Sequence, residues 1–171
     1  MRFIALLALT FLAACSLNDA RLLTGKVRAT PAENAVIIFG VRAEQAPRSE
    51  LRFRFEQQDA ERANCFAIWT RLEVRIPPGI APMRYYAFIA PPGRYQLFGH
   101  SPEDFRTYQF EASAGHVQYI GDFSLRASPY VARAVDAEAA ADVSLRHGLS
   151  VPELTKVEIA EAMGPMRYCT I

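Results

Sequence analysis

The amino-acid sequence predicts an all-β protein, an antiparallel β-sandwich of about seven to nine strands with one short C-terminal helix. Short apolar runs recur along the chain, and segments rich in proline and glycine separate them. A helical pattern occurs once, near the C-terminus. Many short strands with regular turns are typical of a sandwich. The sequence contains no internal repeat and no clear linker, so we expect residues 24–171 to form a single domain.

The first half of the chain contains the clearest strand patterns. Residues 35–43 include a continuous run of apolar, mostly β-branched side chains, which predicts a strand buried on both faces. Between Glu50 and Gln57, apolar and charged residues alternate with a period of two, which predicts a half-buried strand. Residues 24–30 and 66–76 are also predicted to be strands, and Pro77-Pro78-Gly79 ends the second of these.

The middle of the chain predicts two β-hairpins. In the first, two strands flank Pro91-Pro92-Gly93-Arg94, where proline followed by glycine at the central positions indicates a type II turn. In the second, residues 105–112 and 116–125 flank a turn that ends at Gly115. We therefore expect the two strands of each pair to be neighbours in one sheet.

The predicted helix covers residues 136–147. Asp136 can cap its N-terminus, and Glu138 lies in the first turn, where negative charge suits the helix dipole. Gly148 can adopt the left-handed conformation that commonly ends a helix. Residues 155–162 are expected to form a final strand, with a short helix as the alternative.

The N-terminus carries the strongest indication of location. Arg2 precedes an apolar run that is too short to span a bilayer, which needs about 20 residues, and this pattern is typical of an export signal. The run ends in Leu12-Ala13-Ala14-Cys15, which resembles the lipobox of bacterial lipoproteins. The resemblance implies that residues 1–14 are a lipoprotein signal peptide and that residues 15–23 are a lipidated tether.

The same resemblance implies that Cys15 carries diacylglycerol and, in many Gram-negative bacteria, an N-linked fatty acid such as palmitate. Multiple acyl chains give a stable membrane anchor. Ser16 occupies the position at which Asp retains enterobacterial lipoproteins in the inner membrane, so the expected location is the outer membrane, facing the periplasm. The alternative is an ordinary signal cleaved near Ala14, with Cys15 unmodified.

A second resemblance concerns the turns of the central region. Ala90-Pro91-Pro92-Gly93-Arg94-Tyr95-Gln96-Leu97, followed by Ala114-Gly115-His116-Val117-Gln118-Tyr119-Ile120-Gly121, resembles proteobacterial lipoproteins of uncharacterised function. These proteins contain a small sandwich similar to prealbumin-like domains. The resemblance covers about 40 residues and rests on turn chemistry. It supports the fold class and identifies no catalytic residue, because fold does not imply function.

Cysteine usage agrees with an exported protein. With Cys15 committed to lipid, Cys65 and Cys169 remain, and disulfides persist in oxidising compartments. We predict a Cys65–Cys169 disulfide, whose loop of about 100 residues stabilises the fold by roughly 4–5 kcal/mol in the chain-entropy treatment. The alternative is two unrelated thiols.

Charge gives no indication of a polyanionic partner. After removal of Arg2 with the signal, 18 basic and 18 acidic residues remain, and the two signs are interspersed. Nucleic acids are bound by basic patches, and anionic membranes attract basic segments. The sequence therefore indicates no nucleic acid as a partner and predicts that the membrane is met through the lipid anchor.

Catalytic motifs are absent from the sequence. Neither Gly-x-Ser-x-Gly nor Ser-x-x-Lys occurs, and the nine glycines form no phosphate-binding loop. The histidines are scattered, so an enzyme would need the fold to assemble His100, Glu103 and His116 with a further acid, such as Asp104 or Asp122. Otherwise we expect no catalytic residue, metal or cofactor.

The central tyrosines are the remaining candidates for binding. Tyr85 and Tyr86 are neighbours in a predicted strand and therefore point to opposite faces of the sheet. Exposed tyrosines suit sugar or protein surfaces, although ordinary cross-strand packing is the preferred explanation. The sequence thus predicts an envelope lipoprotein that acts as a non-enzymatic binding or structural module for another envelope protein or a glycan. The alternative is a small metal-dependent or hydrolytic enzyme that uses His100 and His116.

Overall fold

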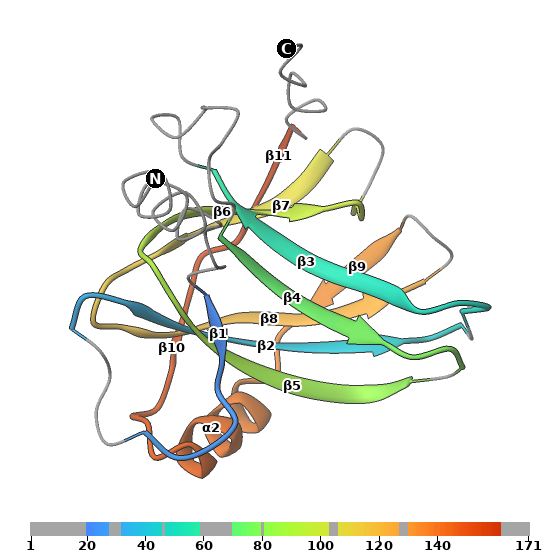
Figure 1. Ribbon diagram of the computed structural model, residues 1–171. Helices are drawn as coiled ribbons and strands as arrows, with labels where there is room; N and C mark the ends of the chain where they lie inside the picture. Colours follow the sequence, from blue (N-terminus) through green and yellow to red (C-terminus); the bar gives the residue numbers. More distant parts are fainter. Residues whose placement is uncertain are drawn as a thin grey trace, which may run out of the picture.

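The computed structural model describes residues 20–27, 32–45, 47–58, 70–79, 81–102, 106–126 and 130–161. These residues form two β-sheets packed face to face, with one short helix on the outer face of one sheet (Figure 1). The predicted fold class is confirmed. The described residues contain eleven strands, more than the seven to nine that we expected.

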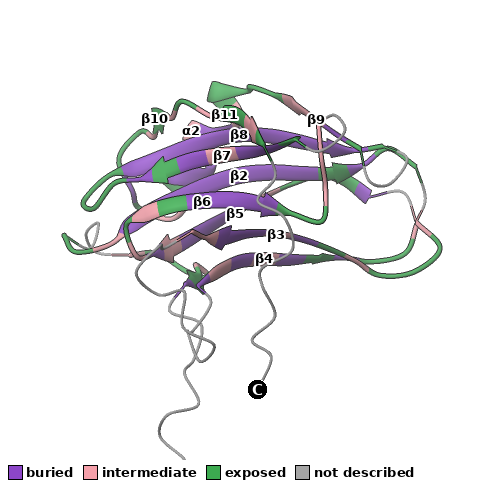
Figure 2. Ribbon diagram, turned by 90° about the horizontal axis from the view of Figure 1, so that it is seen from above, coloured by how far each residue is buried: buried purple, intermediate pink, exposed green. Residues whose placement is uncertain are grey.

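The six-stranded sheet is mixed, and its central strands are buried. It has the order β1-β5-β2-β8-β10, and β9 pairs with β8 beside β10. Strand β8 is parallel to both β2 and β10, which the sequence did not predict. Parallel strands need cover on both faces, and β2 and β8 are buried along almost their whole length (Figure 2). The strands are β1 (Arg21–Leu22), β2 (Ala35–Ala43), β5 (Ala81–Ala90), β8 (Val117–Leu125), β9 (Val131–Ala134) and β10 (Glu153–Leu154).

The five-stranded sheet is antiparallel throughout and has the order β11-β7-β6-β3-β4. The predicted alternation in β3 places three apolar side chains between the sheets and leaves charged side chains on the outer face. The predicted final strand is confirmed as β11. The strands are β3 (Leu51–Gln57), β4 (Arg71–Ile76), β6 (Gly93–Phe98), β7 (Arg106–Ala112) and β11 (Glu158–Glu161).

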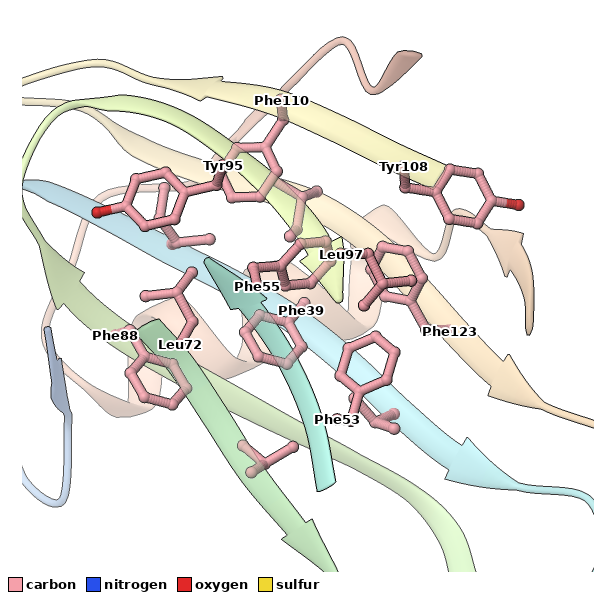
Figure 3. Close-up of a cluster of buried hydrophobic side chains, with 14 of the residues drawn as sticks. Phe39, Phe53, Phe55, Leu72, Phe88, Tyr95, Leu97, Tyr108, Phe110 and Phe123 are labelled. Atoms are coloured by element: carbon pink, nitrogen blue, oxygen red, sulfur yellow. The ribbon is translucent and has the colours of Figure 1, made fainter. Parts of the chain in front are cut away.

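The main core lies between the two sheets and is built largely from aromatic rings (Figure 3). Phe39 from β2 contacts Phe53 and Phe55 from β3, with ring centroids 6.0 and 5.7 Å apart. Phe123 from β8 lies 5.3 Å from Phe53 and 5.4 Å from Phe55. Such pairs stabilise a core beyond their buried area, by about 0.5–1.5 kcal/mol each.

Both predicted hairpins are wrong, because each turn connects the two sheets. The segment Pro91-Pro92 leads from β5 in the six-stranded sheet to β6 in the five-stranded sheet, and Ser113–His116 leads from β7 back to β8. The turn residues do reverse the chain, and Gly93 has the positive φ that its position requires. However, the alternation of core-facing residues is the same whether the next strand pairs in the same sheet or lies in the facing sheet. The pattern therefore could not distinguish a hairpin from a connection between the sheets. The hairpins that do form are β3–β4, β6–β7 and β8–β9.

The predicted helix is confirmed as α2 (Ala137–Arg146). The Asp136 carboxylate accepts a hydrogen bond from the Ala139 backbone N–H at 3.0 Å, and Gly148 follows the helix with a φ of 73°. Ala140 and Val143 pack on the outer face of the six-stranded sheet and form a second, smaller core. The helix thus covers the half of this face where β2 and β8 begin.

The predicted tether is wrong in its last four residues. Ala20 is buried, and β1 pairs with β5 within the range 15–23 that we assigned to the tether. The physical reason is that the edge of β5 offers backbone partners, and the Leu23 N–H also bonds to Ala87 O at 2.8 Å. Residues 24–27 are not a strand, contrary to the prediction for residues 24–30.

Several predicted features lie outside the described residues. They include the signal peptide, Cys15, Cys65, Cys169, Glu103 and Asp104. The lipidation and the Cys65–Cys169 disulfide therefore stay predictions. Among the residues that the structure describes, no helix has the length and apolar character needed to cross a membrane.

Candidate functional site

A β-bulge in β8 organises the polar groups of the six-stranded sheet. Ile38 of β2 lies opposite Tyr119, but Gly40 lies opposite Asp122, so β8 contains one extra residue. Gly121 occupies the bulge with a φ of 114°, a conformation that side-chain-bearing residues rarely adopt. Residues three apart in a regular strand face opposite sides, and the bulge instead turns Tyr119 and Asp122 to the same face.

Two tyrosines hold the Asp122 carboxylate on this outer face. The Tyr119 hydroxyl donates to Oδ1 at 2.7 Å, and the Tyr85 hydroxyl of β5 donates to Oδ2 at 3.0 Å. Gly40 lies beneath them, and a Cβ atom there would be only 2.4 Å from Oδ1 of Asp122. We call Asp122, Tyr119 and Tyr85 the carboxylate cluster. The prediction that Tyr85 and Tyr86 face opposite sides is confirmed, since Tyr86 packs on the main core.

Burial controls the protonation of the carboxylate cluster. It raises the pKa of the Asp122 carboxyl above its ordinary value of 3.8, although the two tyrosine hydrogen bonds act in the opposite direction. Burial, together with the neighbouring Asp122, also raises the pKa of the Tyr85 phenol. The phenols therefore remain donors over the physiological range, and both carboxylate oxygens are occupied by them. Because the Asp136 N–H donates to the Tyr119 hydroxyl at 2.9 Å, the cluster also fixes the start of α2. The hydrogen bonds of the carboxylate cluster therefore hold β5, β8 and the start of α2 together.

An open depression lies on the face of β8 and β9 that is turned away from the carboxylate cluster, toward the other sheet. It is at the end of the sandwich where β2 and β8 finish. Its volume is about 540 Å³, within the roughly 300–1,000 Å³ typical of ligand sites. One wall comes from β9, through Val131, Ala132 and Arg133, and the facing wall comes from Tyr108 of β7 in the other sheet. The Tyr108 ring packs edge-on against Phe123 in the core, and its hydroxyl points away from the cluster of rings (Figure 3). We call this feature the terminal depression.

The rim of the terminal depression is formed by loops that the fold brings together. Gln45 and Arg126 follow the ends of β2 and β8, while Pro102 follows β6. The Val131 N–H donates to Ser101 O at 2.9 Å, which ties the loop after β6 to the start of β9. Tyr130 completes the rim and is 42% exposed.

Arg133 of β9 is one of the two charged residues that line the terminal depression in the described part of the chain. Its Nε donates to Ile120 O at 2.6 Å, at the bulge where β9 and β10 leave a gap along β8. Burial lowers the pKa of the Arg133 guanidinium, an effect that the nearby Tyr108, Tyr119 and Asp122 oppose. Within the described ranges Arg133 forms no ion pair, and Asp122, whose charge acts on it, is bound by two tyrosine hydroxyls. Arg126 on the rim does have a partner, Glu44, at 3.4 Å.

The structure does not bring the predicted histidines together. His100 lies beside Ser101 at the end of the sandwich where β8 finishes, and its ring centroid is 5.7 Å from that of Phe53. His116 lies where β8 begins, with Nδ1 3.2 Å from a Glu153 carboxylate oxygen. The nine residues of β8 separate them by roughly 30 Å. A site that uses both His100 and His116 is therefore ruled out by the geometry.

Metal coordination gains no support from the remaining candidates. In the part of the chain that the structure describes, no three His, Cys, Asp or Glu side chains are arranged to hold a metal ion. His147 lies at the end of α2, where its Nδ1 is 2.9 Å from Gly25 O. Asp122, which the sequence suggested as a partner for histidine, is held by tyrosines instead.

Sequence reasoning missed the roles of Arg133 and of the bulge. A glycine inside a strand pattern, here Gly121, is a known sign of a bulge and would have placed Asp122 beside Tyr119. Nothing in the sequence marks Arg133, because its position depends on β9, a strand of four residues that the pattern did not reveal. Comparison with protein-family models, curated proteins and solved structures finds no match to this chain.

Proposed function

We propose that this protein is a lipid-anchored, non-enzymatic binding module of the cell envelope. The terminal depression is its binding site, and another envelope component is its partner. The observation that carries the proposal is the position of the depression, whose β9 wall pairs with the end of β8, whereas β1 pairs with β5 beside the start of β2. Strand β1 is where the predicted anchor joins the folded domain.

The length of the tether determines which end of the folded domain lies near the membrane. Only five residue steps separate Cys15 from the buried Ala20, which limits the tether to about 18 Å. Strand β1 pairs with the part of β5 that lies beside the start of β2. The nine residues of β2 then span roughly 30 Å toward the depression. A bilayer that holds Cys15 therefore lies near the β1 end, and the depression is turned toward envelope components beyond it.

The anchor is tested by replacing the lipidated cysteine. Cys15→Ser is expected to release the protein from membranes and to abolish incorporation of labelled fatty acid, because no other attachment is proposed. The folded domain should be retained, since Cys15 precedes the first described strand in the sequence. Tight fractionation of the Cys15→Ser protein with membranes, together with fatty-acid incorporation, would contradict the anchor.

The binding site is tested by photocrosslinking in cells. A photoreactive benzophenone residue replaces Tyr130 on the rim in one variant and Arg75 in a control. Arg75 is 64% exposed on β4, the edge strand at the far side of the five-stranded sheet from β7. We expect adducts with an envelope component from position 130 and none from position 75. Equal adduct formation at both positions, or none at position 130, would overturn the proposal.

An envelope location also favours the Cys65–Cys169 disulfide. Thiol labelling of the denatured chain is expected to find both cysteines blocked before reduction and both reactive after it. Two reactive thiols in unreduced protein from the envelope fraction would show that the pair is not bonded.

A further inference from the structure

The chemistry of the terminal depression indicates a ligand that carries negative charge. Arg133 is half-buried and donates one of its five N–H groups to Ile120 O. A guanidinium in such a position is unfavourable without an anionic partner, and its planar fork matches a carboxylate. None of the described residues that line the depression is acidic, and the second arginine of the lining, Arg126 on the rim, is paired with Glu44.

The aromatic part of the lining indicates a ring-shaped ligand. Tyr130 presents an exposed ring on the rim, and Tyr108 forms a wall that core packing holds rigid. A tyrosine offers a flat apolar surface with a polar tip, which suits the C–H face and hydroxyls of a sugar ring. Gln45 adds an amide that can both donate and accept hydrogen bonds.

An extended peptide fits this site less well. Peptides that add to a sheet need a free strand edge of several residues. Strand β9 has only four residues, and its first residue, Val131, already donates its N–H to Ser101 O. The free edge of β9 is therefore too short to pair with an added strand.

We propose that the terminal depression binds a saccharide bearing a carboxylate group, with Arg133 pairing with the carboxylate and Tyr130 covering the sugar ring. This inference rests on the proposed binding function and names its ligand class. It assigns Arg133 as the residue that selects for charge and Tyr130 as the residue that selects for the ring.

Calorimetric titration of the full chain in detergent tests the ligand class. The probes are trigalacturonic acid, its methyl ester, triglutamate and sodium acetate. Trigalacturonic acid is expected to bind saturably, and the other three to bind roughly tenfold or more weakly, because each lacks either the free carboxylate or the sugar rings. Equal affinity for the methyl ester would exclude the charge selection, and equal affinity for triglutamate would exclude the saccharide.

Variants of the same protein locate the site. Arg133→Gln is expected to weaken trigalacturonic acid binding roughly tenfold or more, and Arg133→Lys to weaken it less, because lysine keeps the charge but loses the fork. Tyr130→Ala should also weaken it. Arg75→Gln is the matched control and should bind as the unaltered chain does. Unchanged affinity in Arg133→Gln, with the protein still folded by circular dichroism, would overturn the assignment.

Failure of this inference can be told apart from failure of the proposed function. If trigalacturonic acid does not bind but position 130 forms adducts in cells, the ligand class is wrong and the binding function stands. If neither occurs, both are wrong.

Discussion

The carboxylate cluster and the terminal depression adjoin the same stretch of β8, yet they treat a buried charge in opposite ways. Asp122 has a tyrosine hydroxyl on each oxygen and sits over a glycine that leaves no spare room. Among the described residues Arg133 has one hydrogen-bond partner, Ile120 O, and it faces an open volume of about 540 Å³. A charge whose hydrogen bonds are completed within the protein serves the fold, whereas one whose bonds are incomplete beside open space is suited to a ligand. Changes in the cluster should therefore affect stability, and changes in the depression should affect binding.

The largest expected effect is at Gly121, which underlies both regions. Gly121→Ala is expected to lower the free energy of unfolding by about 3 kcal/mol, from backbone strain and steric overlap together. The new Cβ would lie 2.8 Å from Ala134 O at a φ of 114°. Urea unfolding measures the change. Gly79→Ala, with a positive φ but nothing within 4 Å, should lose only about 1 kcal/mol, and Gly25→Ala should be unchanged. Equal losses at Gly121 and Gly79 would show that the bulge is not tightly packed.

The next largest loss of stability is expected at the two tyrosines of the carboxylate cluster, and it should differ between them. Tyr119→Phe is expected to cost about 2 kcal/mol and Tyr85→Phe about 1 kcal/mol, because Tyr119 bonds both to Asp122 and to the Asp136 N–H. Thermal or urea unfolding of the two variants gives the comparison. A larger loss in Tyr85→Phe would mean that the link to α2 contributes nothing.

The pH dependence of stability should report the buried carboxylate. The raised pKa of Asp122 means that the folded chain holds its proton more tightly than the unfolded chain does. Its stabilising contribution is therefore complete below the ordinary value of 3.8 and is lost as the pH rises through the raised folded value. The free energy of unfolding of the unaltered chain, minus that of Asp122→Asn, should fall as the pH rises from about 4 to 7. A difference that grows with pH would mean that the charged form is favoured by folding.

The smallest effect on stability is expected in the depression itself. Arg133→Gln removes one hydrogen bond to Ile120 O and relieves a half-buried charge, so the free energy of unfolding should change by less than about 1 kcal/mol. Unfolding under the same conditions as for Tyr119→Phe measures it. A loss larger than that of Tyr119→Phe would make Arg133 a structural residue.

The sequence predicted the elements of this fold better than their pairing. Period-two alternation in β3, the continuous apolar run in β2 and the capped helix depend on local patterns, and the structure confirms them. The turns at Pro91-Pro92 and at Ser113–His116 reverse the chain as predicted but connect the two sheets. Local turn chemistry does not distinguish a hairpin from a crossing, since the choice depends on which distant strand offers the better edge.

The candidate site was less predictable for the same reason. Strand alternation alone predicted that Tyr85 and Tyr86 lie on opposite faces of the sheet, and the structure confirms it. The partnership of Tyr119 with Asp122 depends on one bulge, and the position of Arg133 depends on a short strand at the end of β8. The histidines stood out by residue type, but they lie at opposite ends of the strand that separates them.

Parallel titrations of trigalacturonic acid into Arg133→Gln and Tyr85→Phe test the central distinction most directly. We expect Tyr85→Phe to bind as the unaltered chain does although it is less stable. We expect Arg133→Gln to be nearly as stable as the unaltered chain but to bind roughly tenfold or more weakly. Binding of unaltered affinity by Arg133→Gln, with binding lost in Tyr85→Phe, would contradict the division between a structural cluster and a binding depression.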